Sequence, residues 1–190
     1  SKLTRSQLQT LKMQLQQHFL FNALNTIAMM VRRNSSGEAV NMIAGLSDML
    51  RSALSKENKQ FVTLEEELSL ISKYLSIEAV RYQDRLEVQQ NIAAETLPLK
   101  VPNLLLQPIV ENAFKHNVIS KLKPLKLRIY TEGDYLVVWN ILQEKNQRDV
   151  STGYGLDSIR KKYMYHTKRN IQVECNDLHF AVYLPLIPKN

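Results

Sequence analysis

The stretch LQQHFLFNALNTI, residues 15–27, places one histidine among large apolar residues. Its helical spacing puts His18, Asn22 and Asn25 on one side of a helix. The apolar side of this helix is predicted at other positions, Phe19, Leu20, Leu24 and Ile27. A neutral imidazole is a good nucleophile near neutral pH, because its unperturbed pKa is about 6.5. From the residues alone, His18 is a reactive group, a ligand, or a histidine whose hydrogen bonds a neighbour satisfies.

A second polar cluster lies in QPIVENAFKHN, residues 107–117, within an apolar helical pattern. Glu111, Asn112, Lys115 and His116 recur on successive turns of this helix. Carboxylate and amide oxygens are ligands for Mg²⁺, and cationic side chains hydrogen-bond phosphate oxygens. The alternative is a helix whose exposed face is polar for solubility.

A third motif is STGYGL, residues 151–156, where Gly153 and Gly155 precede a predicted helix. Glycines at a helix N-terminus let backbone N–H groups approach a phosphate, and the helix dipole favours the anion. A Gly-x-Gly motif is weak by itself, and no strand ends closely enough before it to form a Rossmann turn.

Charge and cysteine content limit the other classes of function. The chain of 190 residues carries 25 Lys and Arg against 18 Asp and Glu, a net charge of +7. The basic residues are spread along the chain without interleaved aromatic residues or zinc-ligand spacing, so we expect no nucleic-acid partner. Cys175 is the single cysteine, which excludes an internal disulfide and is compatible with a reducing compartment.

Neither a membrane span nor a signal peptide is recognisable in this sequence. No apolar run reaches the roughly 18–20 residues that cross a bilayer. The first residues, SKLTRSQLQTLKMQLQ, already follow a helical pattern without a preceding cap. We therefore expect the chain to be part of a longer protein that continues upstream.

Helical periodicity dominates residues 2–82. After a break at NSSGE, Ser35 and Glu38 fit a capping box that opens a second helix, expected to end near Ser55. The same motif recurs at Thr63 and Glu66 and opens a third helix.

The segment between these two helices, KENKQFV, is a predicted turn. Long helices joined by a short connection favour an antiparallel hairpin. Two helices alone bury too little apolar surface, so we expect a dimer in which they form a four-helix bundle.

The pattern changes after about Asp84. Five segments have the alternation or composition of strands: RLEVQQNI, PLKLRIYTEG, DYLVVWNIL, NIQVEC and HFAVYLPLI. Two segments have helical spacing: VPNLLLQPIVENAFKHNV and GYGLDSIRKKYMYH. Gly133 and Asp134 mark a hairpin turn between the second and third strands. The predicted fold class is α+β, with a helical first half and a mixed second half.

Five segments in this order resemble the conserved boxes of the sensor histidine kinases of the autolysis-sensor class. They are HFLFNALN, LSDMLRSAL, VTLEEELSLISKYLSIEAVRYQDRLE, VPNLLLQPIVENAFKHNV and GYGLDSIRKKY. Each box alone is modest, but the five together at matching spacing cover nearly the whole chain.

The resemblance implies two domains. Residues 1–84 would be the dimerisation and histidine-phosphotransfer helices, and residues 85–190 an ATP-binding α/β sandwich of the gyrase/Hsp90/histidine-kinase type. It also implies ATP and Mg²⁺ as cofactors, a response regulator and a second copy of the chain as partners, and a cytoplasmic position within a membrane-anchored sensor whose membrane segments lie upstream.

The resemblance also implies residue roles. His18 matches the phosphoacceptor, and Asn22 matches the asparagine one turn later. Asn112 matches the Mg²⁺ ligand, with Glu111 as a second candidate. The other expected nucleotide-binding residues are Lys115, His116, Asn117, Asn140, Gly153, Gly155 and Leu156.

Three positions depart from the family pattern. Gln17 replaces a proline before the histidine, and Tyr82 replaces a phenylalanine. Asn140 stands where the family carries the aspartate of an Asp-x-Gly box, and no glycine follows it. An amide oxygen still accepts a hydrogen bond from adenine. Two alternatives therefore stay open: a degenerate kinase that serves as a dimeric scaffold, and an ATPase of the same fold acting on another substrate.

Overall fold

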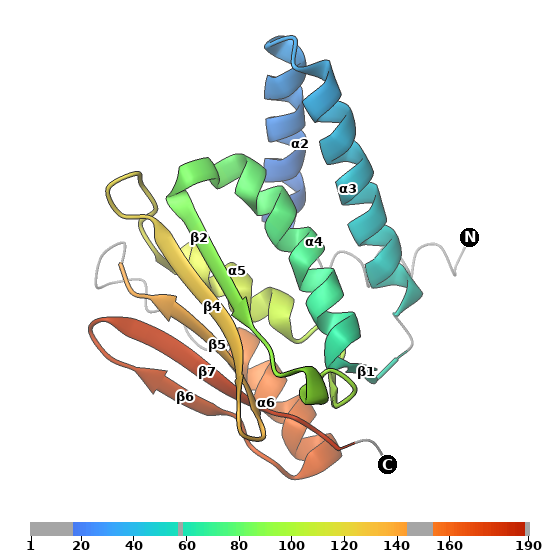
Figure 1. Ribbon diagram of the computed structural model, residues 1–190, viewed down its shortest axis with the longest axis vertical. Coiled ribbons are helices and arrows are strands. Elements are labelled where there is room, and N and C mark those ends of the chain that lie inside the picture. Colours follow the sequence, from blue (N-terminus) through green and yellow to red (C-terminus); the bar gives the residue numbers. More distant parts are fainter. Residues whose placement is uncertain (1–16, 57–58, 144–153, 189–190) are drawn as a thin grey trace. The chain divides into compact units, whose positions relative to one another are not determined.

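The computed structural model describes residues 17–56, 59–143 and 154–188 (Figure 1). The chain divides into two compact units. The first holds the residues up to Lys59 together with Ser69–Tyr82, and the second holds Gln60–Leu68 together with the chain from Gln83 onward. The predicted domain boundary between residues 84 and 85 stays a prediction. The helical pattern predicted before residue 17 lies outside the described residues.

The first unit contains a helical hairpin. Helix α2, Gln17–Arg32, and helix α3, Ser36–Ser55, are joined by a short turn and pack along each other (Figure 1). Helix α2 buries one residue per turn, namely Phe19, Ala23 and Ile27. Helix α3 buries a matching stripe, namely Ala39, Met42, Leu46, Met49 and Ala53. The predicted hairpin is present.

Helix α4, Leu64–Tyr82, contributes its longer part, from Ser69 onward, to this first unit. The ring of Tyr74 lies 4.6 Å from the ring of Phe19, measured between centroids. Lys73 Nζ lies 2.9 Å from Asp48 Oδ2 on α3, and this pair lowers the pKa of the Asp48 carboxyl. An aromatic contact and an ion pair thus connect this part of α4 to the hairpin.

Of the two predicted capping boxes, one is formed and one is not. The backbone N–H of Thr63 donates to Glu66 Oε2 at 3.0 Å, and the N–H of Glu66 donates to Thr63 Oγ1 at 3.1 Å. Ser35 does stand at the N-cap of α3, but its side chain makes no capping hydrogen bond. The reason is its backbone, because ψ of 51° departs from the extended conformation that aims a capping hydroxyl at the first turn.

The second unit is built on a five-stranded sheet. Its strands are β2 (Leu86–Asn91), β4 (Leu125–Glu132), β5 (Tyr135–Ile141), β6 (Gln172–Cys175) and β7 (His179–Pro185). Their order is β2-β4-β5-β7-β6, in which β2 and β4 are parallel and the other neighbours are antiparallel. All five predicted strands are present. Gly133, with φ of +55°, forms the predicted turn between β4 and β5.

A second, two-stranded sheet was not predicted. It pairs β1, Phe61–Thr63, with β3, Lys100–Pro102. The prediction of a turn through KENKQFV was therefore wrong at its last two residues, which belong to β1. Short 3₁₀ turns cover Gln83–Arg85 and Ala94–Thr96.

Helices α5, Leu106–His116, and α6, Tyr154–Thr167, complete the second unit and lie on one face of the large sheet (Figure 1). Alternation along β4 separates the two faces: Leu125, Leu127 and Ile129 are fully buried, whereas Lys126 and Arg128 are exposed. Helices and sheet together confirm the predicted α+β class. Within the described residues, no helix combines the length and the apolar character needed to cross a bilayer.

Candidate functional site

His18 is exposed near the start of α2, while the adjacent Phe19 is buried. Burial of Phe19 fixes the rotation of the helix and turns the imidazole toward solvent. Asn22, one turn later, places Nδ2 3.1 Å from His18 Nδ1 and 3.3 Å from Nε2. A nitrogen so nearly equidistant from both ring nitrogens lies over the face of the ring, since an in-plane position would clash with ring carbons. Asn22 thus leaves the in-plane direction of both ring nitrogens open.

The predicted polar strip of α2 is present, but the predicted apolar side is partly wrong. Asn25 is exposed on the side of His18, as expected. Leu24, however, is 54% exposed, and Leu20 is half-buried. The residue that the helix buries between Phe19 and Ile27 is the small Ala23. The hairpin of one chain therefore leaves large apolar side chains uncovered.

Helix α5 separates its predicted polar cluster into different environments. Glu111 is buried and accepts a hydrogen bond from Gln107 Nε2 at 3.1 Å. Asn112 is half-buried, and within the described residues its side chain makes no hydrogen bond. Lys115 is exposed and His116 is half-buried. The helix is therefore not a uniformly exposed polar face, and within the described residues the Asn112 side chain is free to hold a ligand.

Asn117 ends α5 and is fully engaged within the protein. Its Nδ2 donates to the carbonyl of Ala113 at 2.8 Å, and its Oδ1 accepts the backbone N–H of Gln143 at 2.6 Å. The N–H of Val118 donates in turn to the carbonyl of Gln143 at 2.8 Å. The end of α5 is thus tied to the segment that follows β5. This geometry makes Asn117 a positioning residue.

Asn140 is buried on β5, opposite Leu127 of β4 and Phe180 of β7. Its Nδ2 donates to the carbonyl of Ile141 at 2.8 Å. This bond leaves Oδ1 as the acceptor of the side chain, which is the group that adenine recognition needs.

Of the predicted glycine box, Gly153 lies outside the described residues. Gly155 and Leu156 lie in the first turn of α6, where Leu156 is half-buried. Backbone N–H groups at such a helix start are suited to phosphate.

Glu67 is a positioning residue that the sequence interpretation missed. It is buried in α4, and its carboxylate accepts the backbone N–H groups of Leu106 at 2.9 Å and Leu104 at 3.2 Å. It therefore satisfies otherwise unpaired donors at the N-terminus of α5. One glutamate among three in LEEEL carries no sequence signal for this role.

The residues on α5 fit a magnesium ion in composition. Mg²⁺ is commonly held by one or two protein oxygens together with waters and substrate phosphates. Asn112 offers an amide oxygen that has no hydrogen-bond partner within the described residues, and the preceding residue of the helix, Glu111, supplies a carboxylate. Within the described residues no three His, Cys, Asp or Glu side chains form a cluster, so an all-protein metal cage is not present there.

Comparison with known proteins finds similarity to histidine kinases. Residues 6–86 match the histidine kinase family model. The chain is 41% identical over 138 residues to the sensor histidine kinase BtsS of Escherichia coli K12, covering 72% of this chain and 24% of that protein. It is 38% identical over 117 residues to the sensor histidine kinase/phosphatase LytS of Staphylococcus aureus Mu50, covering 61% of this chain and 20% of that protein.

These matches confirm the resemblance to sensor histidine kinases found in the sequence, and the relatives include LytS. The chain spans about a quarter of the length of the first of these relatives.

Solved structures with a similar arrangement are also histidine kinases. The catalytic domain of ThkA aligns with a TM-score of 0.47 and 17% identity, covering 67% of this chain and 99% of that one. AdeS of Acinetobacter baumannii aligns with a TM-score of 0.43 and 14% identity, covering 89% of this chain and 98% of that one. These distant similarities assign no residue.

Proposed function

We propose that this chain is the catalytic region of a two-component sensor kinase, in which His18 takes the γ-phosphoryl group of ATP and passes it to an aspartate of a response regulator. The observation that carries the proposal is His18 itself. It stands exposed in the HFLFN segment of the region that matches the histidine kinase family, with both ring nitrogens open in the plane of the ring.

The reaction follows from the chemistry of neutral imidazole. The unprotonated ring nitrogen of His18 attacks the γ-phosphorus in line. A P–N bond forms, the bond to the β–γ bridging oxygen breaks, and ADP leaves. The proton on the other ring nitrogen is then released. Such a transfer depends mainly on positioning and on electrostatic stabilisation of the phosphoryl oxygens.

The nucleotide is assigned to the side of α5 and α6. Asn112 would hold Mg²⁺, with Glu111 beside it, and the ion would supply positive charge to the phosphates. Lys115 and His116 would contact phosphate oxygens, while Gly155 and Leu156 would present backbone N–H groups. Asn140 Oδ1 would accept a hydrogen bond from the adenine amino group. The support for these roles is the uncommitted amide of Asn112 and the burial of Asn140.

Three coarser proposals belong to the parent protein. A second copy of the chain would pack against the apolar side chains that α2 and α3 leave exposed. The parent would be a sensor anchored in the inner membrane through segments upstream, and this region would lie in the cytoplasm. Their support is the naming of the relatives as sensor histidine kinases, together with the exposed apolar residues.

A degenerate kinase, acting as a scaffold without ATP turnover, is the second candidate. The observation that favours it is Asn140, which occupies the position of an expected aspartate. Asn140→Leu distinguishes the two candidates, because leucine is similar in size but accepts no hydrogen bond. For the kinase we expect the affinity for ATP to fall by about tenfold or more. For the scaffold we expect no ATP binding by either the native chain or Asn140→Leu.

The direct test is incubation with γ-labelled ATP and Mg²⁺. We expect acid-labile, alkali-stable label on the native chain and none on His18→Gln. His179→Gln is the matched control, since His179 lies in the other unit and bonds Glu174 at 2.9 Å. Label that persists in His18→Gln would overturn the assignment of the acceptor. Absence of both label and nucleotide binding in the native chain would favour the scaffold.

A further inference from the structure

The face of the large sheet turned away from α5 carries its own set of polar and aromatic side chains. Cross-strand pairing aligns Gln89 of β2 with Arg128 of β4, and Arg128 with Trp139 of β5. The next row aligns Asn91 with Tyr130. Because side chains alternate between the two faces of a strand, these five residues point to the same side.

Arg128 is held in a fixed orientation without an acidic partner. Its guanidinium lies 4.7 Å from the centroid of the Trp139 ring, in a cation–π contact. Within the described residues it forms no ion pair, whereas its neighbour Lys126 lies 3.8 Å from Glu87. A stacked guanidinium keeps the hydrogen-bonding edge of its planar fork free.

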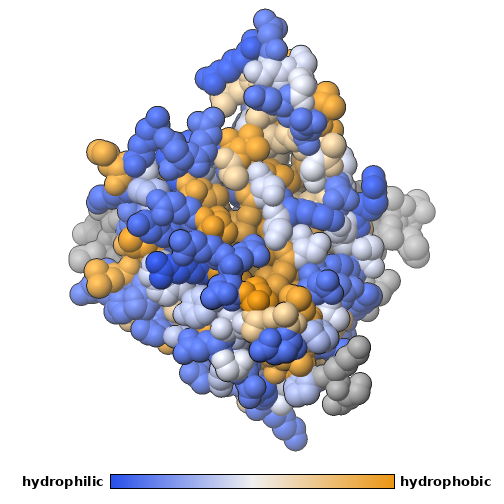
Figure 2. Space-filling view, viewed as in Figure 1, coloured by the Kyte–Doolittle hydropathy of each residue, from blue (hydrophilic) through white to orange (hydrophobic). Residues whose placement is uncertain are grey.

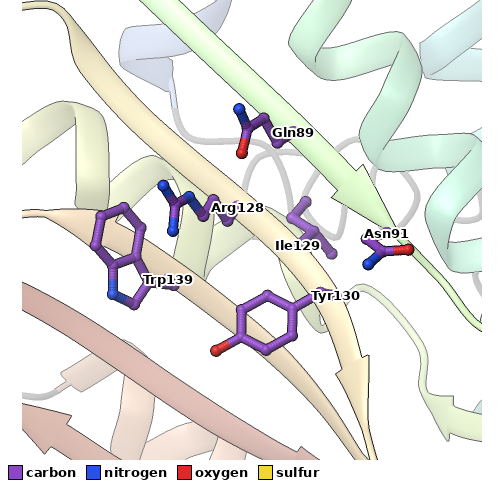
Figure 3. A pocket seen from close by; sticks show the side chains of 6 residues that line it. All are labelled: Gln89, Asn91, Arg128, Ile129, Tyr130 and Trp139. Atoms are coloured by element: carbon purple, nitrogen blue, oxygen red, sulfur yellow. The ribbon is translucent and has the colours of Figure 1, made fainter.

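A hollow of about 320 Å³ lies beside this guanidinium (Figure 3). Its lining consists of Gln89, Asn91, Arg128, Ile129, Tyr130 and Trp139. In the described structure the amides of Gln89 and Asn91 make no side-chain hydrogen bond. Figure 3 shows them on β2, with Arg128 of the adjacent strand β4 between Gln89 and Trp139. One cation held by an aromatic ring and two amides without partners in the described structure thus line the same hollow.

This combination of groups selects among possible ligands. The guanidinium fork matches the two oxygens of a carboxylate, and amide N–H groups add hydrogen bonds to them. The rings of Trp139 and Tyr130 offer apolar walls for a flat body attached to that carboxylate. A single cation is poorly matched to the double charge of a phosphate. The volume is at the lower end of the range for small-molecule pockets, about 300–1,000 Å³.

We propose that Arg128, Trp139, Gln89 and Asn91 form a binding site for a small flat carboxylic acid on the open face of the sheet. The site lies on the opposite side of the sheet from the residues assigned to ATP, and it does not depend on the proposed kinase activity. It gives the second unit a place at which a small anion binds separately from nucleotide.

The test uses Trp139, the single tryptophan of the chain, as its own reporter. Benzoate is the probe, and fluorescence of the native chain is followed as its concentration rises to the millimolar range. We expect a saturable change with benzoate. We expect none with benzamide, which has the same shape but no charge, and a much weaker change with inorganic phosphate. A change with benzamide equal to that with benzoate would overturn the proposal, as would a linear, non-saturating response to benzoate.

Two variants locate the site. Arg128→Lys keeps the charge but loses the fork, and we expect the dissociation constant for benzoate to rise at least tenfold. Lys126→Gln removes a neighbouring exposed cation from the same strand and should leave that constant unchanged. Equal weakening by both variants would show attraction to general surface charge and overturn the site. Unchanged melting temperatures exclude misfolding, and a chemical-shift change confined to the Trp139 indole N–H on adding benzoate would support the site independently.

Discussion

The role proposed for His18 requires an imidazole that is reachable from solvent and still held at a defined place, and two neighbouring residues of α2 are compatible with both requirements. Phe19 is buried against Tyr74 and fixes the helix, while His18 faces outward. Asn22 lies over the imidazole without blocking either ring nitrogen in its plane. An amide in this position is suited to hold a water near a phosphorylated partner, rather than to take a proton from His18.

Asn22→Ala is therefore expected to separate two activities. Labelling of His18 by ATP should change by no more than a few-fold, because the ring nitrogens do not depend on the amide. Dephosphorylation of a phosphorylated response regulator should slow by about tenfold or more, as for loss of a group that positions water. Asn25→Ala, on the same strip, is the control. Unchanged dephosphorylation in Asn22→Ala would remove this role.

Asn112 of α5 and Asn117, directly after its end, are predicted to differ in how much stability is lost when each is removed. Asn117→Ala removes two hydrogen bonds at a buried position, so the free energy of unfolding should fall by about 1–3 kcal/mol. Asn112→Ala removes no hydrogen bond within the described residues, so stability should stay within about 0.5 kcal/mol. Urea unfolding measures both values.

For nucleotide binding the order of the two residues should be reversed, so that the loss of Asn112 matters more than the loss of Asn117. We expect Asn112→Ala to lose at least tenfold in affinity for ATP with Mg²⁺, and little without Mg²⁺. Titration calorimetry with and without a chelator measures this difference. A loss of affinity that is independent of Mg²⁺ would mean that Asn112 does not act through the ion.

Residue types and spacing were a better guide to which side chains are candidates for the site than to the role of each side chain. The motif marked Glu111, Asn112 and Asn117 alike, but of these three only Asn112 has no hydrogen-bond partner within the part of the chain that the structure describes. The commitment of Asn117 depends on its bond to Gln143, which lies 26 residues later in the chain, after β5. Glu67 was missed for the same reason, since its partners, Leu104 just before α5 and Leu106 at its start, are 37 and 39 residues away. The local sequence carries no signal for hydrogen bonds between residues so far apart in the chain.

Among the secondary-structure elements, helices and long strands followed from periodicity, whereas short pieces did not. The three-residue strands β1 and β3 are too short to show alternation and pair only through the tertiary fold. Parallel pairing of β2 with β4 was likewise not predictable, because it depends on a long connection that includes α5. Where a local hydrogen bond decides the outcome, as at Thr63, prediction and structure agree.

The two predicted capping boxes give a matched experiment. Thr63→Ala removes a formed cap at the start of α4, and the free energy of unfolding should fall by about 1 kcal/mol. Ser35→Ala removes a side chain that makes no cap at the start of α3, and the change should stay within about 0.5 kcal/mol. Denaturant unfolding of both variants measures the difference. Equal losses would show that Ser35 does cap α3 in solution.

Glu78 should make the stability of α4 depend on pH. Burial raises the pKa of its carboxyl, although Arg81 NH1 lies 2.9 Å from both oxygens and lowers it. A raised folded-state pKa favours the protonated acid. Its contribution to stability is therefore complete below the unfolded value near 4.5 and is lost as the pH rises through the folded value.

Glu78→Gln removes this titration. Between pH 4 and pH 7, the unfolding free energy of the native chain should fall relative to that of the variant. Denaturant unfolding at several pH values measures the slope, and Glu65→Gln, at an exposed position of the same helix, is the control. Parallel pH profiles for the native chain and Glu78→Gln would contradict the prediction.

For the whole molecule, the sequence predicted the class of protein more securely than its assembly. Five ordered boxes span most of the chain, and the family match, over residues 6–86, covers the first two and nearly all of the third. Assembly depends instead on which apolar residues stay uncovered once the helices have packed. Periodicity assigned Leu24 to the buried side, but the structure exposes it, because the small Ala23 occupies the contact with the rest of the unit. Only the folded hairpin shows this surface.

The exposed apolar side chains of the hairpin lead to the last prediction, the dimer. Phe21 is 63% exposed on α2, and Val40 is 62% exposed on α3. Others on the same two helices are Leu24, Met29, Val31, Ile43 and Leu54. Hydrophobic residues accordingly show on the surface of these helices among polar ones (Figure 2). A monomer rarely leaves so many large apolar groups in contact with water on one pair of helices, and a four-helix bundle would cover them.

We expect Phe21→Glu with Val40→Glu to raise the dimer dissociation constant at least tenfold in sedimentation equilibrium. Leu122→Glu, at a position 95% exposed in the other unit, should not change it. A native chain that stays monomeric at the highest soluble concentration would contradict the dimer, because the surface would then be satisfied by water alone.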